Sequence, residues 1–412
     1  MADLEASDSG STVPVGKSYM PKWLRAEEAA KQAEPEPEND GGLFKVPYTT
    51  ILAVNPHTNA DRLELCTVYG FQVIASKGKY KVGDKIIYVP VDSIIPEWLE
   101  NILFPEGSKI TLTKRRVRQI RIRKLASQGM IVDPSDVASK MSVDSLPLET
   151  NLASALEITK YVPPAMRERG QDTPKLRNKP KENPRFHKYG GIDNIKWYPN
   201  YFNDQEVVIQ EKLHGSNCRA SFSKSSPNTL WKKIKAFFRL LPAYEYCYGS
   251  NNVQLQERPG NVGFYGEDVY GAVLNKVDAF NKLKPGETIY GELIGPGIQK
   301  GYEYGHKEHH FVLFDVKVER PDGSQEYLDP EEAEAFAKER GFDFVPVLYR
   351  GLFNPELAKE LSMGASVYAP SEKVREGVVI KARKGYSNFS SKKALKLISE
   401  KYLDDPSNTD NH

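Results

Sequence analysis

The chain has 412 residues, of which 39% are hydrophobic and 27% are charged, and its formal net charge is +2. This length allows two domains with flanking segments, and the composition is typical of a soluble globular protein. No run of about 18 apolar residues occurs, so we expect no membrane-spanning helix. Cys66, Cys218 and Cys247 are too few and too scattered for a disulfide framework or a Cys-x-x-Cys zinc site. We therefore expect free thiols and an intracellular, cytoplasmic protein, with the nucleus and organelles left open.

The beginning of the chain predicts a disordered segment. Residues 1–43 are rich in Ser, Glu, Ala and Pro, and they offer too little apolar surface to offset the entropy lost on ordering. A short helix over residues 21–32 is the one element expected there. Because a basic region and an apolar stretch are both missing, we expect no secretory signal.

Residues 44–134 predict a small β-barrel. Five strand-like runs recur with glycine and proline turns between them: TTILAV, LELCTV, FQVIAS, KIIYVPV and VRQIRIRKL. Five short strands so close together favour an OB-fold, a class that binds oligonucleotides. If the last run is one strand, Ile120 and Ile122 face the core while Arg121 and Arg123 face a ligand.

Basic residues are concentrated at the end of this region. Residues 109–124 contain eight lysines or arginines and no acid: Lys109, Lys114, Arg115, Arg116, Arg118, Arg121, Arg123 and Lys124. A second basic stretch covers residues 175–188. Such clusters suit a polyanion, because cations that contact phosphates release counterions. A solvated surface is the alternative, and we favour nucleic acid for the first cluster because no acid interrupts it.

The rest of the chain divides into three parts. Residues 135–184 are dense in proline and lysine and predict an exposed linker. Residues 185–404 mix strand-like and helix-like runs and predict an α and β domain, followed by a tail over residues 405–412.

One helix in the second domain is clearly marked at both ends. Asp329 can cap it, Pro330 suits its first position, and acids follow in its first turn. Gly341 can end it.

The stretch EKLHGSNCR, from Glu211 to Arg219, carries the strongest chemical signal. It follows a predicted strand and places Lys212 and Gly215 in a Lys-x-x-Gly pattern. A lysine becomes a nucleophile for phosphorus when burial, cations or a metal lower its pKa. The glycine lets backbone approach a phosphate. The pattern alone is common, and an exposed lysine in a turn is the alternative.

Four more segments follow in order: YGELIGPGIQK at 290–300, FVLFDV at 311–316, EGVVIK at 376–381 and ALKL at 394–397. With the Lys212 stretch, they resemble motifs I, III, IIIa, IV and V of the covalent nucleotidyltransferase superfamily of polynucleotide ligases and capping enzymes. EKLHGSN and GELIGPGIQKGYEYG are similar to the RNA ligase 2 branch. NPHTNADRLELCTVYGFQVIASKGKYKVGDKIIYVPVDSIIP, with RIRKLASQGMIV, resembles the OB module of the Deinococcus-type and Naegleria-type RNA ligases.

This resemblance implies an α+β fold. An N-terminal OB-fold β-barrel would precede an α/β nucleotidyltransferase domain with ATP-grasp-like, antiparallel sheets. The implied activity is an ATP-dependent RNA ligase that joins RNA 3′-OH and 5′-phosphate ends in RNA repair. It would use a lysyl–AMP intermediate and an RNA 5′-adenylate. ATP would be its nucleotide, Mg2+ or Mn2+ its metal and nicked or broken RNA its partner. We expect no membrane and no obligate protein partner.

The resemblance also implies residue roles in catalysis. Lys212 would be the nucleophile, and Lys396 would contact the α-phosphate. Glu292 and Glu376 would position the metal through water, and Glu292 could also bind the ribose. His214 would act in sealing. Mg2+ keeps most of its water, so two carboxylates suffice, and a cation beside Lys212 would favour its neutral amine.

Further candidates surround the nucleotide and the RNA. Phe314 would stack on adenine, and Arg219 would contact the ribose or the RNA 5′-phosphate. The other nucleotide-binding candidates are Glu211, Gly215 and Lys393. The RNA-binding candidates are Arg118, Arg121, Arg123, Asn251 and Lys381. Taken singly, each of these residues also fits an ordinary surface or core position, and their order along the chain is what favours the functional interpretation.

Two features depart from the resemblance. Motif V usually reads Lys-x-Lys, whereas here Lys396 is followed by Leu397 and Ile398, and Lys393 lies at an offset that changes strand face. Residues 223–243 form an insertion in which apolar and basic residues alternate at helical spacing. A helix packed on the core is one interpretation of the insertion, and a helix that contacts RNA or a membrane surface is the other.

Three alternative functions remain open at this stage. The chain could be a DNA ligase or a GTP-using capping enzyme, although it ends soon after motif V and we expect no C-terminal OB domain. It could be an OB-fold tRNA- or RNA-binding protein with a non-catalytic second domain, since NADRLEL also resembles tRNA-binding modules. It could be a degenerate ligase that serves as a scaffold.

Overall fold

The structure is a computed structural model that describes residues 44–108, 111–161, 182–255, 268–299, 302, 304–369, 374–388 and 391–404. These residues belong to one of the chain's two units, residues 41–412. The segment and helix predicted before residue 44, the tail after residue 404, Lys109 and residues 175–181 lie outside this description.

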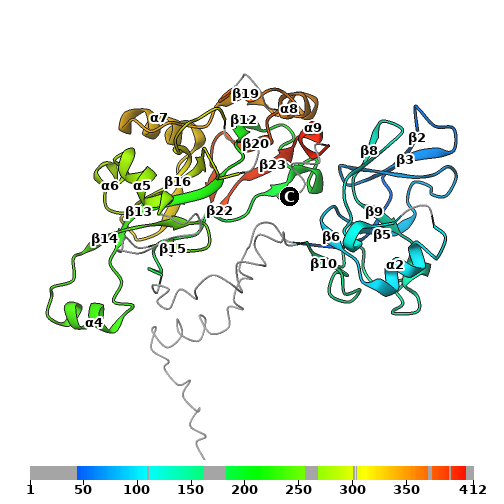
Figure 1. Ribbon diagram of the computed structural model, residues 1–412, viewed down its shortest axis with the longest axis horizontal. Coiled ribbons are helices and arrows are strands. Elements are labelled where there is room, and N and C mark those ends of the chain that lie inside the picture. The colour runs from blue at the N-terminus through cyan, green and yellow to red at the C-terminus, as the bar shows by residue number, and fades with distance from the viewer. Residues whose placement is uncertain are drawn as a thin grey trace, which may run out of the picture. The chain divides into compact units, whose positions relative to one another are not determined.

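The N-terminal domain consists of short strands, drawn in blue to cyan in Figure 1. Its strands are β1 (Tyr48–Thr50), β2 (Ala53–Pro56), β3 (Leu63–Val68), β4 (Phe71–Ser76), β5 (Lys85–Val89), β6 (Ser93–Ile94), β7 (Ile120–Ile122), β8 (Leu125–Ser127), β9 (Met130–Val132) and β10 (Thr159–Lys160), and its α-helix is α2 (Glu97–Leu103). The strands pair as β1-β5-β9, β2-β3-β4, β7-β8 and β10-β6. Within the described residues they remain separate small sheets and do not close into one hydrogen-bonded barrel.

The predicted linker is wrong in its first half. Val137, Val143, Leu152 and Ile158 are buried and pack into the same core as Tyr48. Side-chain burial against the sheet therefore fixes residues 135–161 to the N-terminal domain, despite a composition that favours an extended chain.

The predicted strand VRQIRIRKL is also wrong. It folds into the β7–β8 hairpin, because Arg123 and Lys124 both have positive φ, at 49° and 76°. Two such residues form the tight turn whose twist suits a hairpin. Ile120 is consequently 49% exposed and does not face the core.

The second domain contains two sheets, drawn in green to red in Figure 1. The five-stranded sheet has the order β11-β23-β20-β12-β19, with β11 (Asp193–Asn194), β23 (Ala394–Ile398), β20 (Gly377–Ala382), β12 (Glu206–Lys212) and β19 (Val347–Leu352). The six-stranded sheet has the order β15-β14-β13-β16-β17-β18, with β15 (Gln254–Leu255), β14 (Tyr244–Ser250), β13 (Ser216–Lys224), β16 (Glu287–Ile294), β17 (His310–Glu319) and β18 (Gln325–Tyr327). β21 (Ser387–Asn388) and β22 (Ser391–Lys392) form a separate hairpin. Apart from β11 with β23, the pairs within the two large sheets are antiparallel.

Helices cover the outer faces of the two sheets. α5 (Val269–Lys276), α6 (Ala279–Lys282) and α7 (Pro330–Arg340) contribute to the core on one face of the six-stranded sheet. α8 (Pro355–Ser362) contributes Ala358 to the core of the five-stranded sheet. α9 (Glu400–Leu403) follows β23. The predicted helix limits are confirmed for α7: it begins after Asp329, has Pro330 first and ends at Gly341, whose φ is 64°.

α4 (Leu230–Phe237) is the helix of the insertion, and Figure 1 shows it projecting away from the two sheets. None of its residues is buried, and Trp231 and Phe237 are 74% and 82% exposed. The interpretation that this helix packs on the core is therefore wrong. No helix in the described part of the chain combines the length and apolar character needed to cross a membrane.

Candidate active site

Lys212 ends β12, which lies between β20 and β19 in the five-stranded sheet. Its backbone is paired with Gly377 of β20, so Glu376, one residue earlier, is brought beside it. Lys212 Nζ donates to Glu376 Oε1 and Oε2, with both distances 2.7 Å. Glu376 is 3% exposed. Strand pairing thus joins two residues that the sequence separates by 164 positions.

Gly215 explains how the six-stranded sheet reaches this ion pair. A Cβ atom at Gly215 would lie 2.4 Å from the Leu293 carbonyl oxygen and 2.7 Å from Glu292 Cγ. Only glycine lets the turn after Lys212 pack so closely on β16. The turn therefore brings Glu292 of β16 into electrostatic range of Lys212 and Glu376.

The two glutamates have opposite pKa shifts. Burial raises the pKa of Glu292 to about 8, since the attraction of Lys212 is offset in part by repulsion from Glu376. Burial also acts on Glu376, but the charge of Lys212 and contacts with His214 outweigh it and lower its pKa to about 2. At neutral pH the pocket therefore holds one carboxylate and one protonated acid.

Lys212 is charged in this arrangement. Burial favours the neutral amine, but the charge of the Glu376 carboxylate and its hydrogen bond to Lys212 outweigh it, and the pKa of Lys212 is raised. We expected cations around Lys212 to favour its neutral form. The structure places its acidic partner in direct contact instead, so the amine must lose a proton before it can attack phosphorus.

Lys396 and His214 complete the cluster. Lys396 lies on β23 opposite Val379, and burial, then the charge of Lys212, lowers its pKa to about 8. The His214 ring is 5% exposed, with Nδ1 3.6 Å from Glu376 Oε2. The structure therefore brings Lys212, His214, Glu292, Glu376 and Lys396 together, as the sequence predicted.

Three residues of this pocket were not singled out from the sequence. Tyr304 accepts a hydrogen bond from the His214 backbone N–H at 2.7 Å, and the Tyr402 hydroxyl lies 3.3 Å from His214 Nε2. Asn217 lies opposite Glu292 between β13 and β16, and its side-chain oxygen is buried without a hydrogen bond. Asn217 stands in the quoted EKLHGSN stretch, so its motif position could have indicated it.

The proposed nucleotide-binding residues separate into two groups. Glu211 is 2% exposed, and its Oε2 accepts the Val367 N–H at 2.8 Å while Oε1 is buried without a partner. Phe314 is half-buried and packs with Leu213. Arg219 does not fit its predicted role: it is fully buried, and its guanidinium donates to the backbone oxygens of Phe186 and Ser250. Its Nη2 makes no hydrogen bond but is buried, so it is not open to a ribose at the surface.

Lys393 has a mainly structural position. Its backbone N–H donates to the Tyr386 oxygen, and its oxygen accepts the Ala382 N–H. It precedes β23, whereas Lys396 lies within that strand. Lys393 therefore does not occupy the strand position at which motif V has its second lysine.

The RNA-binding candidates of the N-terminal domain remain at its surface. Arg118, Arg121 and Arg123 are exposed, although Arg121 contacts Asp404. Arg116 of the same basic cluster is 3% exposed and pairs with Asp92 at 2.7 Å. An acid that is distant in the sequence therefore neutralises one of the basic residues of this cluster.

Two other RNA-binding candidates are turned inward. Lys381 is 1% exposed, and its Nζ lies 2.7 Å from both Asp315 Oδ1 and the Phe314 oxygen. The Asn251 side-chain oxygen accepts the Tyr189 N–H at 2.9 Å. Lys381 is therefore closed to RNA, whereas Asn251 is half-buried with its side-chain oxygen bonded within the domain.

The acids of the cluster suit a hard divalent cation. No group of three or more His, Cys, Asp or Glu side chains in the described residues forms a metal site. Glu292 and Glu376 offer carboxylate oxygens only, the donor type that Mg2+ and Mn2+ accept while they keep water ligands. These two residues would hold such an ion.

Comparison with known proteins agrees with the fold and motifs. Residues 205–398 match a family model described as RNA ligase, and residues 46–134 match an OB-fold domain model. Solved structures of an RNA ligase from Naegleria gruberi are similar at 22% identity over 88% of this chain and 98% of that one. The TM-scores are 0.64 for a lysine-to-alanine variant with ATP and Mn, 0.65 for an apo variant and 0.64 for the enzyme with PPi.

At this identity the structural likeness shows the fold alone, whereas the family models identify the two domains. Both domains occur in the order expected from the motifs. Residues 205–398 therefore match the RNA ligase family model, and a match to an OB-fold domain model precedes them.

Proposed function

We propose that this protein is an ATP-dependent RNA ligase that joins 3′-OH and 5′-phosphate ends of nicked or broken RNA through AMP bound to Lys212. The observation that carries the proposal is the buried pair of Lys212 and Glu376, with Glu292 and Lys396 around it. Nucleotidyl transfer needs positioned charge more than covalent chemistry from the protein. This cluster places both acidic and basic side chains around the amine of Lys212.

The first step would attach AMP to the enzyme. Lys212 Nζ loses a proton, for which the oxygens of Glu376 are the acceptors already in contact, and it attacks the α-phosphorus of ATP. An N–P bond forms, the bond to the β-phosphate oxygen breaks, and pyrophosphate leaves. Lys396 would neutralise charge on the α-phosphate. A divalent cation held by Glu292 and Glu376 would supply further neutralisation.

The later steps would move AMP to RNA and then seal the strand. An RNA 5′-phosphate oxygen attacks the same phosphorus, and Lys212 leaves. The RNA 3′-OH then attacks the activated 5′-phosphate, and AMP leaves with the bonding electron pair. His214, near Glu376 and enclosed by Tyr402, is placed to orient these groups. Glu211 Oε1, buried without a partner, is placed to accept a hydrogen bond from the base.

The test is transfer of label from ATP labelled at the α-phosphate. Wild type and Lys338→Met, which changes an exposed lysine on α7, should both retain label on a denaturing gel. Lys212→Met should not, and label retained by this variant would contradict the assignment. Labelled GTP should give no adduct, which separates the proposal from a capping enzyme. Nicked RNA and nicked DNA duplexes then compare the sealed products.

Two finer points also stay proposals. An intracellular location fits the three cysteines, which are all buried and unbridged. A protein that works without an obligate partner is the simplest arrangement, because the residues proposed for catalysis all come from one chain. Activity of the purified chain alone on a nicked RNA would test the second point.

A further inference from the structure

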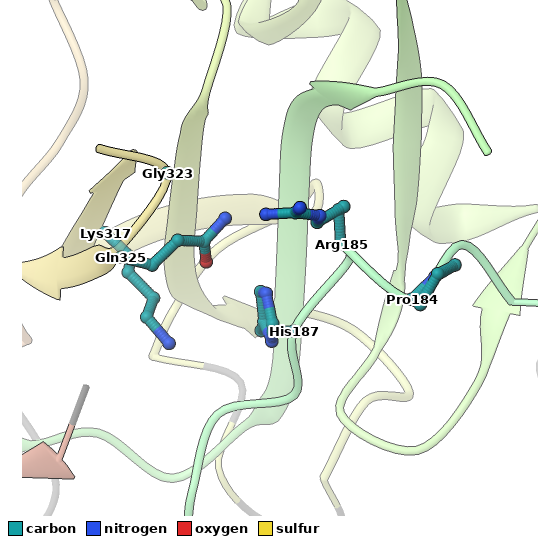
Figure 2. Close-up of a pocket in the computed structure, with 6 residues that line it drawn as sticks. All are labelled: Pro184, Arg185, His187, Lys317, Gly323 and Gln325. Carbon is teal, nitrogen blue, oxygen red and sulfur yellow. The ribbon is translucent and has the colours of Figure 1, made fainter. Parts of the chain in front are cut away.

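A second polar cavity lies outside the Lys212 cluster. It has a volume of about 300 Å3 and is lined by Pro184, Arg185, His187, Lys317, Gly323 and Gln325. Figure 2 shows the side chains of Arg185, His187, Lys317 and Gln325 extending toward a common space. The lining holds three basic side chains and no acid.

Lys317 is the unusual residue of this cavity. It is 6% exposed on β17, and within the described part of the chain its Nζ has no hydrogen-bond or carboxylate partner. Its one contact of this kind is the Tyr327 ring, 5.0 Å from Nζ. Burial lowers the pKa of Lys317. Partial burial of a cation that no described carboxylate pairs with disfavours its charged form and lowers stability.

Asp315, two residues before Lys317 on the same strand, is paired with other groups. Asp315 Oδ1 accepts Lys381 Nζ at 2.7 Å. Asp315 Oδ2 accepts the hydroxyls of Tyr189 at 2.5 Å and Tyr386 at 2.8 Å. Lys381 therefore has the partner that Lys317 lacks, although both lysines are buried in the same domain.

His187 and Gln325 add hydrogen-bond donors to the cavity rather than charge. Burial, then the charges of Lys317 and Arg185, lowers the pKa of His187 to about 4. The neutral ring can still donate one N–H. Gln325 Oε1 is buried without a hydrogen bond, and its amide can also present two N–H donors when it turns over. Cations and amide donors around one space are the groups that bind a phosphate.

The cavity is separate from the proposed nucleotide site. Lys317 pairs with Thr288 on β16, four residues before Glu292, a separation of roughly 13 Å along a strand. Buried Tyr189, Tyr290 and Tyr327 pack together between these positions. A group held at Lys212 is thus divided from the cavity by packed rings.

We propose that the cavity of Arg185, His187, Lys317 and Gln325 binds a phosphate group, supplied by the phosphodiester backbone of the RNA substrate. The proposal rests on the proposed RNA ligase function. Free pyrophosphate shares the same chemistry and is the second possible source. An RNA phosphate in this cavity would hold the substrate on the second domain, away from the reacting ends.

The test measures RNA binding against salt, with nicked RNA duplex, EDTA and no ATP. Wild type, Lys317→Met, Arg185→Gln and the exposed-lysine control Lys338→Met are compared. Each lost phosphate contact should reduce the slope of log K against log salt by about 1. We expect that reduction for Lys317→Met and Arg185→Gln and no change for the control.

Thermal unfolding separates a binding role from a structural one. Lys317→Met removes an uncompensated buried charge and keeps the apolar chain, so its Tm should rise by about 2–4 °C. A lysine kept for packing or pairing would give a lower Tm when replaced. Weaker RNA binding together with a higher Tm would therefore support the phosphate site, and a lower Tm with an unchanged salt slope would overturn it.

Two controls distinguish the source of the phosphate and the failure of either proposal. If pyrophosphate raises the Tm of wild type but not of Lys317→Met, while the RNA slopes are equal, the phosphate is free and not part of RNA. If neither ligand distinguishes the two proteins, the phosphate site is wrong. AMP transfer to Lys212 is measured in parallel. If transfer is intact and wild type and Lys317→Met have equal salt slopes for RNA binding, only the phosphate site in the cavity is refuted. If wild type takes up no AMP, the ligase proposal is refuted.

Discussion

Lys212 and Glu376 form a two-point ion pair between neighbouring strands, with Nζ 2.7 Å from each carboxylate oxygen. The pair stores the nucleophile as an ammonium beside its proton acceptor. Stability and catalysis are thereby linked at one pair of side chains.

Replacement of Glu376 should separate these two effects. Glu376→Gln leaves the Lys212 ammonium buried without its counter-ion, which typically costs about 3–5 kcal/mol. The loss should fall below this range, because the Lys212 side chain is 28% exposed. Urea unfolding gives the measurement. Adding Lys212→Met to Glu376→Gln removes the ammonium that has lost its counter-ion, and it should restore much of the lost free energy of unfolding. A double variant no more stable than Glu376→Gln alone would contradict the explanation.

Glu292 predicts how stability depends on pH. Its pKa rises from 4.5 to about 8 on folding, so the folded state holds its proton more tightly than the unfolded state. This contribution to stability is full below about pH 4.5 and is lost as pH rises toward 8, at up to about 1.4 kcal/mol per pH unit. Glu292→Gln should flatten the unfolding free energy in this range. Equal pH profiles for the two proteins would show that Glu292 does not carry the shift.

The opposite sign applies to Glu376. Its pKa falls from 4.5 to about 2, so its contribution is full above about pH 4.5 and disappears as the pH drops toward 2. Acid unfolding of wild type should therefore steepen in this window. The double variant Lys212→Met, Glu376→Gln should lose this pH dependence. If its unfolding curve below about pH 4.5 matches that of wild type, the ion pair is not the cause.

Lys396 should limit AMP transfer at high pH. Its pKa is lowered to about 8, so the free enzyme loses this positive charge above that pH. Lys396→Arg keeps its charge and should extend the high-pH plateau of kcat/KM, which reports free-enzyme pKa values. Lys396→Met should lower the rate at all pH values. Superimposable profiles for wild type and Lys396→Arg would exclude titration of this lysine.

His214 should act after AMP transfer. His214→Ala is expected to take up AMP but to seal a pre-adenylated RNA poorly. Tyr402→Phe removes the hydroxyl 3.3 Å from His214 Nε2 and should weaken sealing in the same direction by a smaller factor. Single-turnover sealing measures both variants. Unimpaired sealing by His214→Ala would remove His214 from the mechanism.

Local patterns in the sequence were sufficient for several elements. The runs LELCTV and FQVIAS coincide with β3 and β4, and the capping residues of α7 marked both of its ends. Such signals depend on neighbouring residues alone. The β7–β8 turn was missed because Arg123 and Lys124 rarely adopt positive φ. The sequence has no glycine or asparagine at these two positions to indicate a tight turn.

By itself, the sequence determined which residues to propose for the chemistry, because Lys212, Glu292, Glu376 and Lys396 stand in ordered motifs, and strand pairing gathers them into one pocket. Only the tertiary structure decided the charge and exposure of each side chain. Arg219 and Lys381 are fully or almost fully buried, Lys212 is held as an ammonium, and Lys317 lies against the Tyr327 ring. Burial and ion pairing depend on residues distant in the chain, and a linear pattern does not record those contacts.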